Sequence, residues 1–464
     1  MAECFFALAR LVVSHPPRLA IPAPGRLVPR SSLATILSAK MRVNSIQLAL
    51  AGLAAVSNAV PVKQSVDTQK PITKLQLGPR PYWLVDSLED SPLKTELEQC
   101  KEMEMKPTAW SIGHRGGGTM QIPEHSIESF LAGTRMGAGI QECDVAFTKD
   151  LELVCRHSHC DLHTTTNIVD IPELNAKCTT PFQPADPATG KTATAKCCTS
   201  DITIAEYKTL CAKMDGSNPN ATTTAQYLKG TPTWRTDLYS NECAKVLTHK
   251  ESIKLIDSLG LKFTPELKTP EVPMPFAGDY TQEKFAQQMI DEYKEAGIDP
   301  SRVYPQSFLY ADILYWLKAE PEFAKQAVLL DESADAPGAF PGAVANLTRY
   351  AADGVPIIAP PLPYLVTVGK DDSGKEKLVP SIYATEAKRL GMKIIAWTAE
   401  RSGWVGNAAR SGDYYYATVA NYTKKDGDVY QVLDVLGRDI GVLGVFSDWS
   451  ATVTYYANCF GLFP

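Results

Sequence analysis

The sequence predicts an α/β protein built as a TIM-type barrel, with eight parallel strands and a cysteine-rich insertion after the second strand. From residue 109 onward, short apolar runs alternate with amphipathic segments, and this alternation is typical of a parallel sheet. About eight such units over roughly 350 residues favour a closed barrel. An open doubly wound sheet is the alternative, but no glycine-rich dinucleotide-binding motif follows the first predicted strand.

The apolar runs give the predicted strands and the segments between them the predicted helices. The strand candidates are residues 109–114, 140–147, 151–156, 261–267, 302–307, 326–331, 356–359, 393–398 and 442–446. Two clear amphipathic segments lie at 280–297 and 381–391.

Residues 158–248 interrupt this alternation. They contain six cysteines and many Thr, Pro, Asn and Lys residues. Because a bare loop of about 90 residues is uncommon in a compact domain, we predict a disulfide-stabilised insertion over one barrel mouth. The barrel domain as a whole is predicted to span 109–464. Residues 61–108 are predicted to form an N-terminal extension that packs on its outside.

Residues 1–60 are interpreted as a leader. Residues 41–60 have a basic start at Arg42, an apolar centre and small residues near the end, which together predict a signal peptide. We interpret residues 1–40 as an over-extended gene model upstream of Met41. The alternative is a mitochondrial-type leader, because this segment is rich in arginine and poor in acids, although Pro16, Pro17, Pro22 and Pro24 would break an amphipathic helix there.

Cysteines and glycosylation motifs indicate a secreted protein. Only Cys4 of the eleven cysteines lies in the leader, and an even remaining set favours disulfides. Asn220, Asn346 and Asn421 each begin an Asn-X-Thr acceptor for N-glycosylation. No apolar run reaches the roughly 18 residues of a transmembrane segment. A pI near 5.8 and the lack of a basic run argue against a nucleic-acid partner.

Three acidic residues stand at predicted strand ends. Glu142 and Asp144 are two positions apart and therefore point to one face of their strand, and Glu266 ends a later strand. Barrel enzymes carry their chemistry at the C-terminal ends of the strands. Three carboxylates converging there would repel one another unless they shared a cation, and all-oxygen ligation suits Mg²⁺ or Ca²⁺. We therefore predict one divalent cation as cofactor.

Histidines and basic residues complete the predicted site. His114 and Arg115 end the first strand just before three glycines, and His157 follows a later strand. Arg115 and Lys268 suit an anionic phosphate, and two histidines can divide the work of general base and general acid. These residue types predict a phosphodiester-cleaving site. Trp397 is assigned to the substrate mouth, with the barrel core as the alternative.

A zinc site is an alternative for part of this region, formed by His157, His159, Cys160 and His163. In a secreted chain a disulfide at Cys160 is favoured instead, with the two later histidines in the structure of the insertion or at the substrate rim.

Four further residues carry open or specific expectations. Adjacent Cys197 and Cys198 are expected to pair with different partners, and Cys143 to face the helix layer, either free or bridged. Glu124 either supports the site or stabilises a helix start.

The ordered motifs resemble the glycerophosphodiester phosphodiesterase family, in a long, secreted, cysteine-rich branch. The matching pieces run in order from about residue 111 to 449 and are GHRGGG…PEHSIESF, ECDVAFTKDLELVCRH, TPELK, VYPQSF, IIAWT and GVLGVFSDW. The resemblance implies a TIM barrel with a small insertion after the second strand. It also implies a catalytic pair, metal ligands and phosphate-holding positions, which match His114 and His157; Glu142, Asp144 and Glu266; and Arg115 and Lys268.

The sequence departs from the family pattern at three positions. Ser158 stands where many relatives have Asp, His163 stands near an Arg position, and His125 stands where Asn is common. These departures bear on the orientation of His157 and on substrate preference more than on the type of reaction.

The predicted function is metal-dependent hydrolysis of a small-molecule glycerophosphodiester to glycerol 3-phosphate and an alcohol. One alternative is phospholipase D-like cleavage of lysophospholipids or sphingolipids to cyclic phosphates, which an apolar, membrane-facing rim on the insertion would favour; a narrow polar mouth would favour soluble diesters. The other is a catalytically inactive secreted barrel glycoprotein. Its signature would be the loss of a catalytic histidine or a metal ligand, and none of these residues is missing.

Overall fold

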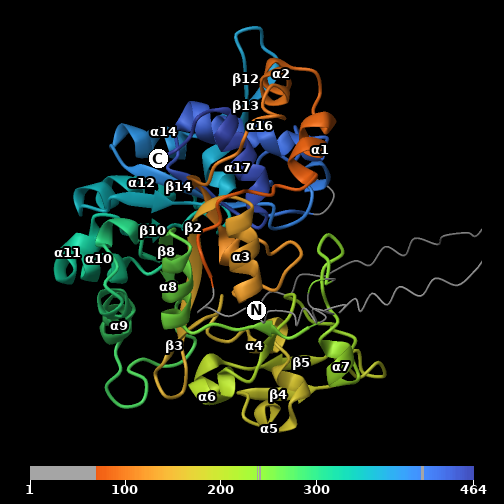
Figure 1. Ribbon diagram of the computed structural model, residues 1–464, viewed down its shortest axis with the longest axis vertical. Helices are drawn as coiled ribbons and strands as arrows, with labels where there is room; N and C mark the ends of the chain where they lie inside the picture. The colour runs from red at the N-terminus through yellow and green to blue at the C-terminus, as the bar shows by residue number, and fades with distance from the viewer. Residues whose placement is uncertain (1–68, 238, 240–241, 409–411) are drawn as a thin grey trace, which may run out of the picture. The chain divides into compact units, whose positions relative to one another are not determined.

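The computed structural model describes residues 69–237, 239, 242–408 and 412–464 (Figure 1). Its centre is a closed barrel of eight parallel strands, as the sequence predicts, and pairing of β1 with both β2 and β15 closes it. In order around the barrel the strands are β1 (Thr108–Gly113), β2 (Ala138–Phe147), β8 (Lys262–Leu267), β9 (Gln306–Ser307), β10 (Val328–Leu330), β11 (Ile357–Ala359), β14 (Lys393–Ala399) and β15 (Gly444–Ser447). The predicted leader at 1–60 lies outside the described residues.

Helices connect successive strands on the outside of the barrel. The longer ones are α3 (Ile127–Arg135), α8 (His249–Ser258), α9 (Gln282–Glu295), α10 (Tyr310–Ala319), α12 (Phe340–Ala352), α14 (Ile382–Arg389), α16 (Val429–Asp434) and α17 (Ser450–Cys459). Shorter elements are η2 (His114–Gly116), η5 (Pro300–Arg302), α11 (Pro321–Ala324), α13 (Leu362–Leu365), the hairpin β12 (Val366–Lys370) and β13 (Glu376–Pro380), η6 (Val405–Asn407), η7 (Asp426–Asp428) and η8 (Val435–Ile440). The predicted helical segments 280–297 and 381–391 contain α9 and α14. None of the helices in the described part of the chain combines the length and apolar character needed to cross a membrane.

The barrel interior is filled by apolar side chains from successive strands. These are Ile112, Ile140, Val328, Leu330, Ile357, Ala359, Ile395 and Phe446, which form a cluster separate from the larger one between strands and helices. Because side chains alternate along a strand, residues two positions beyond an interior residue point to the same side. This periodicity carries the strand-end side chains of β1, β2 and β15 into the barrel mouth.

The predicted strand at 151–156 is not a barrel strand. β3 (Leu153–Cys155) runs antiparallel to the end of β2 and pairs Cys155 with Val145. The resulting hairpin returns the chain to the mouth, where Arg156 donates its backbone N–H to the Asp144 carbonyl over 2.8 Å. His157 therefore reaches the site by a hairpin and not from a ninth parallel strand.

The chain between β3 and α8 has a hydrophobic core of its own. Its elements are α4 (Leu162–Thr165), η3 (Ile168–Asp170), α5 (Pro172–Asn175), β4 (Thr180–Gln183), β5 (Thr194–Lys196), η4 (Thr199–Asp201), α6 (Ile204–Tyr207), β6 (Cys211–Ala212), α7 (Thr224–Tyr227) and β7 (Ala244–Lys245). The disulfides within it are Cys160–Cys198, Cys178–Cys197 and Cys211–Cys243. The two adjacent cysteines thus have different partners, as predicted.

Two helices precede the barrel, α1 (Arg80–Ser87) and α2 (Pro92–Glu98). They bury Leu84, Val85 and Leu97 in the cluster that lies between the barrel and its helices. A disulfide between Cys100 and Cys459 joins the end of this segment to α17.

Candidate active site

The strand register brings the three predicted metal ligands together. Asp144 on β2 is paired with Glu266 on β8, and Glu142 lies two residues before Asp144 on the same face. One carboxylate oxygen from each residue lies within 4.8 Å of the others, and all three residues are buried. The cluster is set by β-sheet geometry and not by a flexible loop.

The electrostatics of this cluster fit a bound cation. Burial, together with the neighbouring carboxylates, raises the pKa of Glu142 well above its usual value. Burial also raises the pKa of Glu266 to about 8, although nearby Lys268 opposes the shift. Asp144 Oδ1 is buried and has no hydrogen-bond partner among the described residues. Carboxylates crowded in this way are typical ligands of a divalent cation that prefers oxygen.

The three glycines after Arg115 allow a tight turn packed against other backbone. Gly116 and Gly117 have φ values of 107° and 81°, a region that favours glycine. A Cβ on Gly117 would lie 2.7 Å from the Gly113 Cα, and the Gly116 carbonyl oxygen lies 2.0 Å from where a Cβ on Gly133 of α3 would stand. Both a close backbone approach and a tight turn therefore explain this stretch.

Arg115 has a left-handed backbone as well, with φ of 52°. Its backbone N–H donates to Glu142 Oε2 over 2.8 Å, and its guanidinium donates to Glu124 over 3.0 and 3.2 Å. Glu124 also accepts from Arg401 over 3.2 Å. Of the two roles open for Glu124, its contacts correspond to support of the site.

His114 and Asp448 form a buried pair at the ends of β1 and β15. His114 Nδ1 lies 2.5 Å from Asp448 Oδ1. Burial raises the Asp448 pKa, but the charge of Arg401 and the hydrogen bond with His114 outweigh it and hold that pKa below its usual value. Burial lowers the His114 pKa to about 4 in spite of Asp448. An ionised carboxylate only accepts, so the neutral ring donates from Nδ1 and its Nε2 is free to accept a proton.

His157 lines the same cavity from the hairpin. Burial, and then the positive charges of Arg115 and Lys268, lower its pKa well below the usual value. Lys268 itself is partly buried and donates to Glu266. A phosphodiester anion between Arg115 and Lys268 would offset the charges that hold His157 neutral.

One cavity of about 60 Å³ joins these groups, with a charged side and an aromatic side. Its lining residues are His114, Arg115, Glu142, His157, Glu266, Phe308, Leu330, Trp397, Tyr415 and Phe446. Trp397 donates its ring N–H to the Ala359 carbonyl over 2.7 Å, which fixes the indole at the rim. Five of the seven predicted catalytic, phosphate and metal residues thus line this cavity together with Trp397. The other two, Asp144 and Lys268, adjoin it through Glu266.

Sequence reasoning missed several residues of this site. Asp448 follows the interior residue Phe446 by two positions, so strand periodicity could have found it. Gln306 donates to Glu142 Oε1 over 3.0 Å, and His125 Nε2 lies 2.9 Å from Asp144 Oδ2. Arg235, from the chain between β3 and α8, donates to Asp448. No local sequence pattern indicated this contact.

The zinc alternative is wrong. Cys160 is bonded to Cys198, His159 Nε2 lies 2.8 Å from Ser200 Oγ, and the ring of His163 accepts the Cys197 backbone N–H over 3.3 Å. These two histidines belong to the structure of the insertion.

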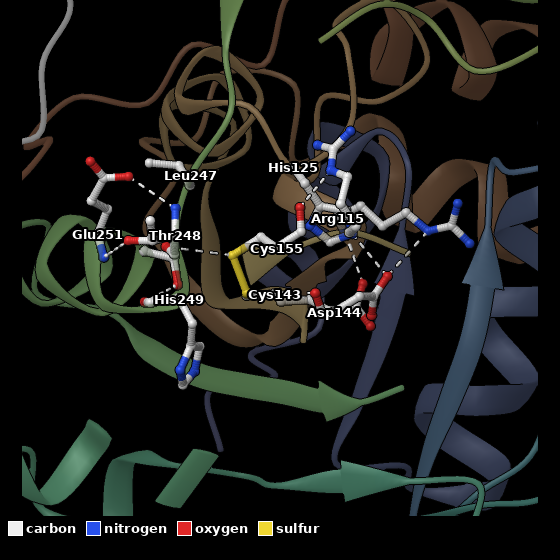
Figure 2. Close-up of a disulfide and its surroundings, with 12 residues drawn as sticks. Arg115, His125, Cys143, Asp144, Cys155, Leu247, Thr248, His249 and Glu251 are labelled. Carbon is white, nitrogen blue, oxygen red and sulfur yellow. Dashed lines mark hydrogen bonds and ion pairs between the residues drawn. A yellow bond between two sulfur atoms is a disulfide. The ribbon is translucent and has the colours of Figure 1, made fainter. Parts of the chain in front are cut away.

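A disulfide lies at the strand that carries Glu142 and Asp144. Cys143, between the two β2 carboxylates, is bonded to Cys155 of β3, and Figure 2 shows Asp144 on one side of this bond and Thr248 on the other. Cys155 also donates its backbone N–H to the Leu247 carbonyl over 3.1 Å. The bond therefore joins β2, which carries Glu142 and Asp144, to β3, which precedes His157.

Removal of this disulfide should loosen the site. We expect the double substitution Cys143→Ala/Cys155→Ala to lower the free energy of unfolding by about 2–4 kcal/mol and to weaken cation binding. Denaturant unfolding and a cation titration would measure both. Cys211→Ala/Cys243→Ala is the control, since that bond lies within the insertion. Equal loss of cation affinity in both variants would contradict the expectation.

Arg235 links the insertion to the pair formed by His114 and Asp448. It donates to Asp448 Oδ2 over 2.7 Å, where Arg401 donates over 3.1 Å. Because Arg401 keeps its contact, Arg235→Ala should lower kcat by about tenfold, equivalent to about 1.4 kcal/mol, with little change in KM. It should also shift the pH dependence of kcat, which a structural defect alone would not do. Arg302→Ala, which removes an exposed pair with Asp257, is the control. An unchanged kcat for Arg235→Ala would exclude this positioning role.

A barrel with two histidines, two basic side chains (Arg115 and Lys268) and a carboxylate cluster at its C-terminal mouth has the features of a hydrolase acting on phosphate esters. The model of the glycerophosphoryl diester phosphodiesterase family matches residues 114–450. The chain belongs to this family. Its family and its fold support phosphodiesterase activity.

Individual proteins are also similar to this chain. The chain is 49% identical over 249 residues to a protein named "Extracellular protein" from Arthroderma benhamiae, and the alignment covers 54% of this chain and 100% of that protein. A structure from Silicibacter pomeroyi has 17% identity and a TM-score of 0.49, with 80% of this chain and 99% of that one covered. An Oleispira antarctica phosphodiesterase, in complex with its product sn-glycerol-3-phosphate, has 17% identity and a TM-score of 0.43, with 74% and 95% covered.

Proposed function

We propose that this protein is a cation-dependent phosphodiesterase that hydrolyses glycerophosphodiesters to glycerol 3-phosphate and a free alcohol. The observation that carries the proposal is the convergence of His114, His157 and the three-carboxylate cluster on one cavity. Every residue that the inactive-scaffold alternative would have lost is present and assembled, which favours catalysis.

Each side chain has a defined task in this proposal. His114 Nε2 takes the proton of the attacking hydroxyl, from water or from the substrate, while Asp448 holds the ring through Nδ1. His157 donates a proton to the leaving alcohol oxygen. Arg115 and Lys268 bind the phosphate through their positive charges. Arg115 Nε has no hydrogen-bond partner among the described residues and lies 3.7 Å from Asp144 Oδ2.

Glu142, Asp144 and Glu266 would hold one divalent cation, either Mg²⁺ or Ca²⁺. When bound, the cation supplies positive charge next to the phosphate. The unpartnered Asp144 Oδ1 and the raised pKa values of the two glutamates support this assignment.

The protein is proposed to be secreted. The five disulfides of the described chain and the name of the Arthroderma benhamiae relative support this. Of the three predicted glycosylation sites, Asn220 and Asn421 are exposed and Asn346 is partly exposed.

The direct test follows release of glycerol 3-phosphate from glycerophosphocholine, glycerophosphoethanolamine and glycerophosphoinositol, by protein expressed from Met41. Release that stops with EDTA and returns with excess Mg²⁺ or Ca²⁺ is expected for at least one diester. A folded, cation-supplied protein that releases product from none of them would overturn the proposal.

A further inference from the structure

A large apolar groove lies beside the catalytic cavity, at the same end of the barrel. Its volume is about 520 Å³, within the range of about 300–1,000 Å³ usual for small-molecule sites. It is formed by the segments after β10, β11 and β14 together with the start of α14. The lining residues are Ala334, Asp335, Phe340, Pro363, Tyr364, Thr367, Ser381, Ile382, Tyr414, Ala417 and Thr418.

Contacting aromatic rings lie between the groove and the catalytic cavity. Tyr414 lines the groove, whereas Trp397 and Tyr415 line the cavity. The Tyr414 ring is stacked on Trp397 with centroids 6.4 Å apart, and it meets Tyr415 edge-on at 5.1 Å. One layer of rings therefore separates the phosphate position from the groove, and a substrate can extend across the rim.

The chemistry of the groove suits a hydrocarbon. Among the residues that the structure describes, its lining includes no lysine, arginine or histidine. Its one carboxylate, Asp335, already accepts hydrogen bonds from the Tyr364 and Tyr414 hydroxyls, both over 2.7 Å. Ile382 is 64% exposed and Tyr414 39% exposed, which is unusual for apolar and aromatic side chains next to a cavity and typical of a binding groove.

We propose that this groove binds the hydrocarbon chain of a lysophospholipid-type diester whose phosphate lies between Arg115 and Lys268. This inference rests on the proposed function and specifies an acylated glycerophosphodiester as the substrate, from which the same cleavage would release an acylglycerol 3-phosphate and the free alcohol. The catalytic cavity is small and takes the phosphate with its nearest atoms, so the rest of the substrate must pass the rim. The groove at the rim is large and apolar, and its described lining residues offer no cation for a second anionic group.

Binding of lysophosphatidylcholines to EDTA-treated protein tests the groove apart from catalysis. Chains of increasing length would be titrated calorimetrically below the concentration at which micelles form, with chain-free glycerophosphocholine as reference. Each added methylene should tighten binding about three- to fourfold until the groove is filled. Affinity that does not change with chain length would overturn the inference, even if glycerophosphocholine is hydrolysed.

A matched pair of surface variants locates the effect. Ile382→Glu introduces a charge into the groove, while Leu314→Glu introduces one at a 39% exposed apolar residue of α10 that is not part of the groove. Ile382→Glu should lower the ratio of kcat/KM for the lysolipid over that for glycerophosphocholine at least tenfold, and Leu314→Glu should leave it unchanged. Equal ratios in both variants would overturn the inference. Chain-dependent binding without turnover of any diester would support the groove and reject the proposed function.

Discussion

Replacement of His114 by alanine should lower kcat for diester hydrolysis by about a thousandfold, within the range usual for loss of a general base. The His114 ring is buried, neutral and fixed through Nδ1 by Asp448, so that Nε2 is the only free acceptor it presents to the cavity. Steady-state kinetics with glycerophosphocholine would measure the loss. KM should change little, because phosphate binding is assigned to Arg115 and Lys268.

His163→Gln is the matched control for this substitution. His163 follows His157 by six positions in sequence, but its ring accepts the Cys197 backbone N–H within the insertion. Asp448→Asn should also be impaired, by about a hundredfold or more, because an amide does not fix the same tautomer of His114. If His114→Ala kept most of its activity while remaining folded, the assignment of the base would be wrong.

Addition of Mg²⁺ or Ca²⁺ to EDTA-treated protein should restore activity and raise Tm by a few degrees, because a cation that binds only the folded state stabilises it. Glu266→Gln should remove most of this Tm shift, since it removes one carboxylate of the cluster. Differential scanning calorimetry would measure it. Glu283→Gln, at an exposed position on α9, is the control and should keep the full shift.

The pH dependence of the same shift gives a second readout. The pKa of Glu266 is raised from 4.5 to about 8 in the folded protein. The folded state therefore holds this proton more tightly than the unfolded state, and the cation-free protein should lose stability as the pH rises from about 4.5 to 8. A saturating cation should flatten this slope. A Tm that responds to neither cation nor Glu266→Gln would contradict the metal site.

The sequence was informative wherever function depends on strand ends. Parallel strands of a barrel end at one mouth, so spacing along single strands was enough to bring Glu142 and Asp144 together with Glu266. The same logic could have given Asp448. The role of Glu124 was left open because one of its two partners, Arg401, lies 277 positions away in sequence.

Other parts depend on contacts between distant segments. Arg235 reaches Asp448 from the insertion, over more than 200 positions of sequence, and no local periodicity encodes such a contact. The direction of β3 follows from a tight hairpin after β2, where the strand pattern alone does not separate parallel from antiparallel pairing. Disulfide pairing likewise cannot be deduced from spacing. The groove combines three segments after different strands, so its apolar character appears only in three dimensions.

The central claim is that the His114, His157 and carboxylate constellation cleaves a phosphodiester with the help of a cation. The most direct measurement is ³¹P NMR of glycerophosphocholine and of lysophosphatidylcholine incubated with the protein, with and without EDTA, and with His114→Ala. We expect the resonance of the starting diester to be replaced by that of a phosphomonoester or a cyclic phosphate, and both EDTA and His114→Ala to abolish this change. An unchanged diester resonance with folded, cation-supplied protein, or turnover that persists in His114→Ala, would contradict the central claim.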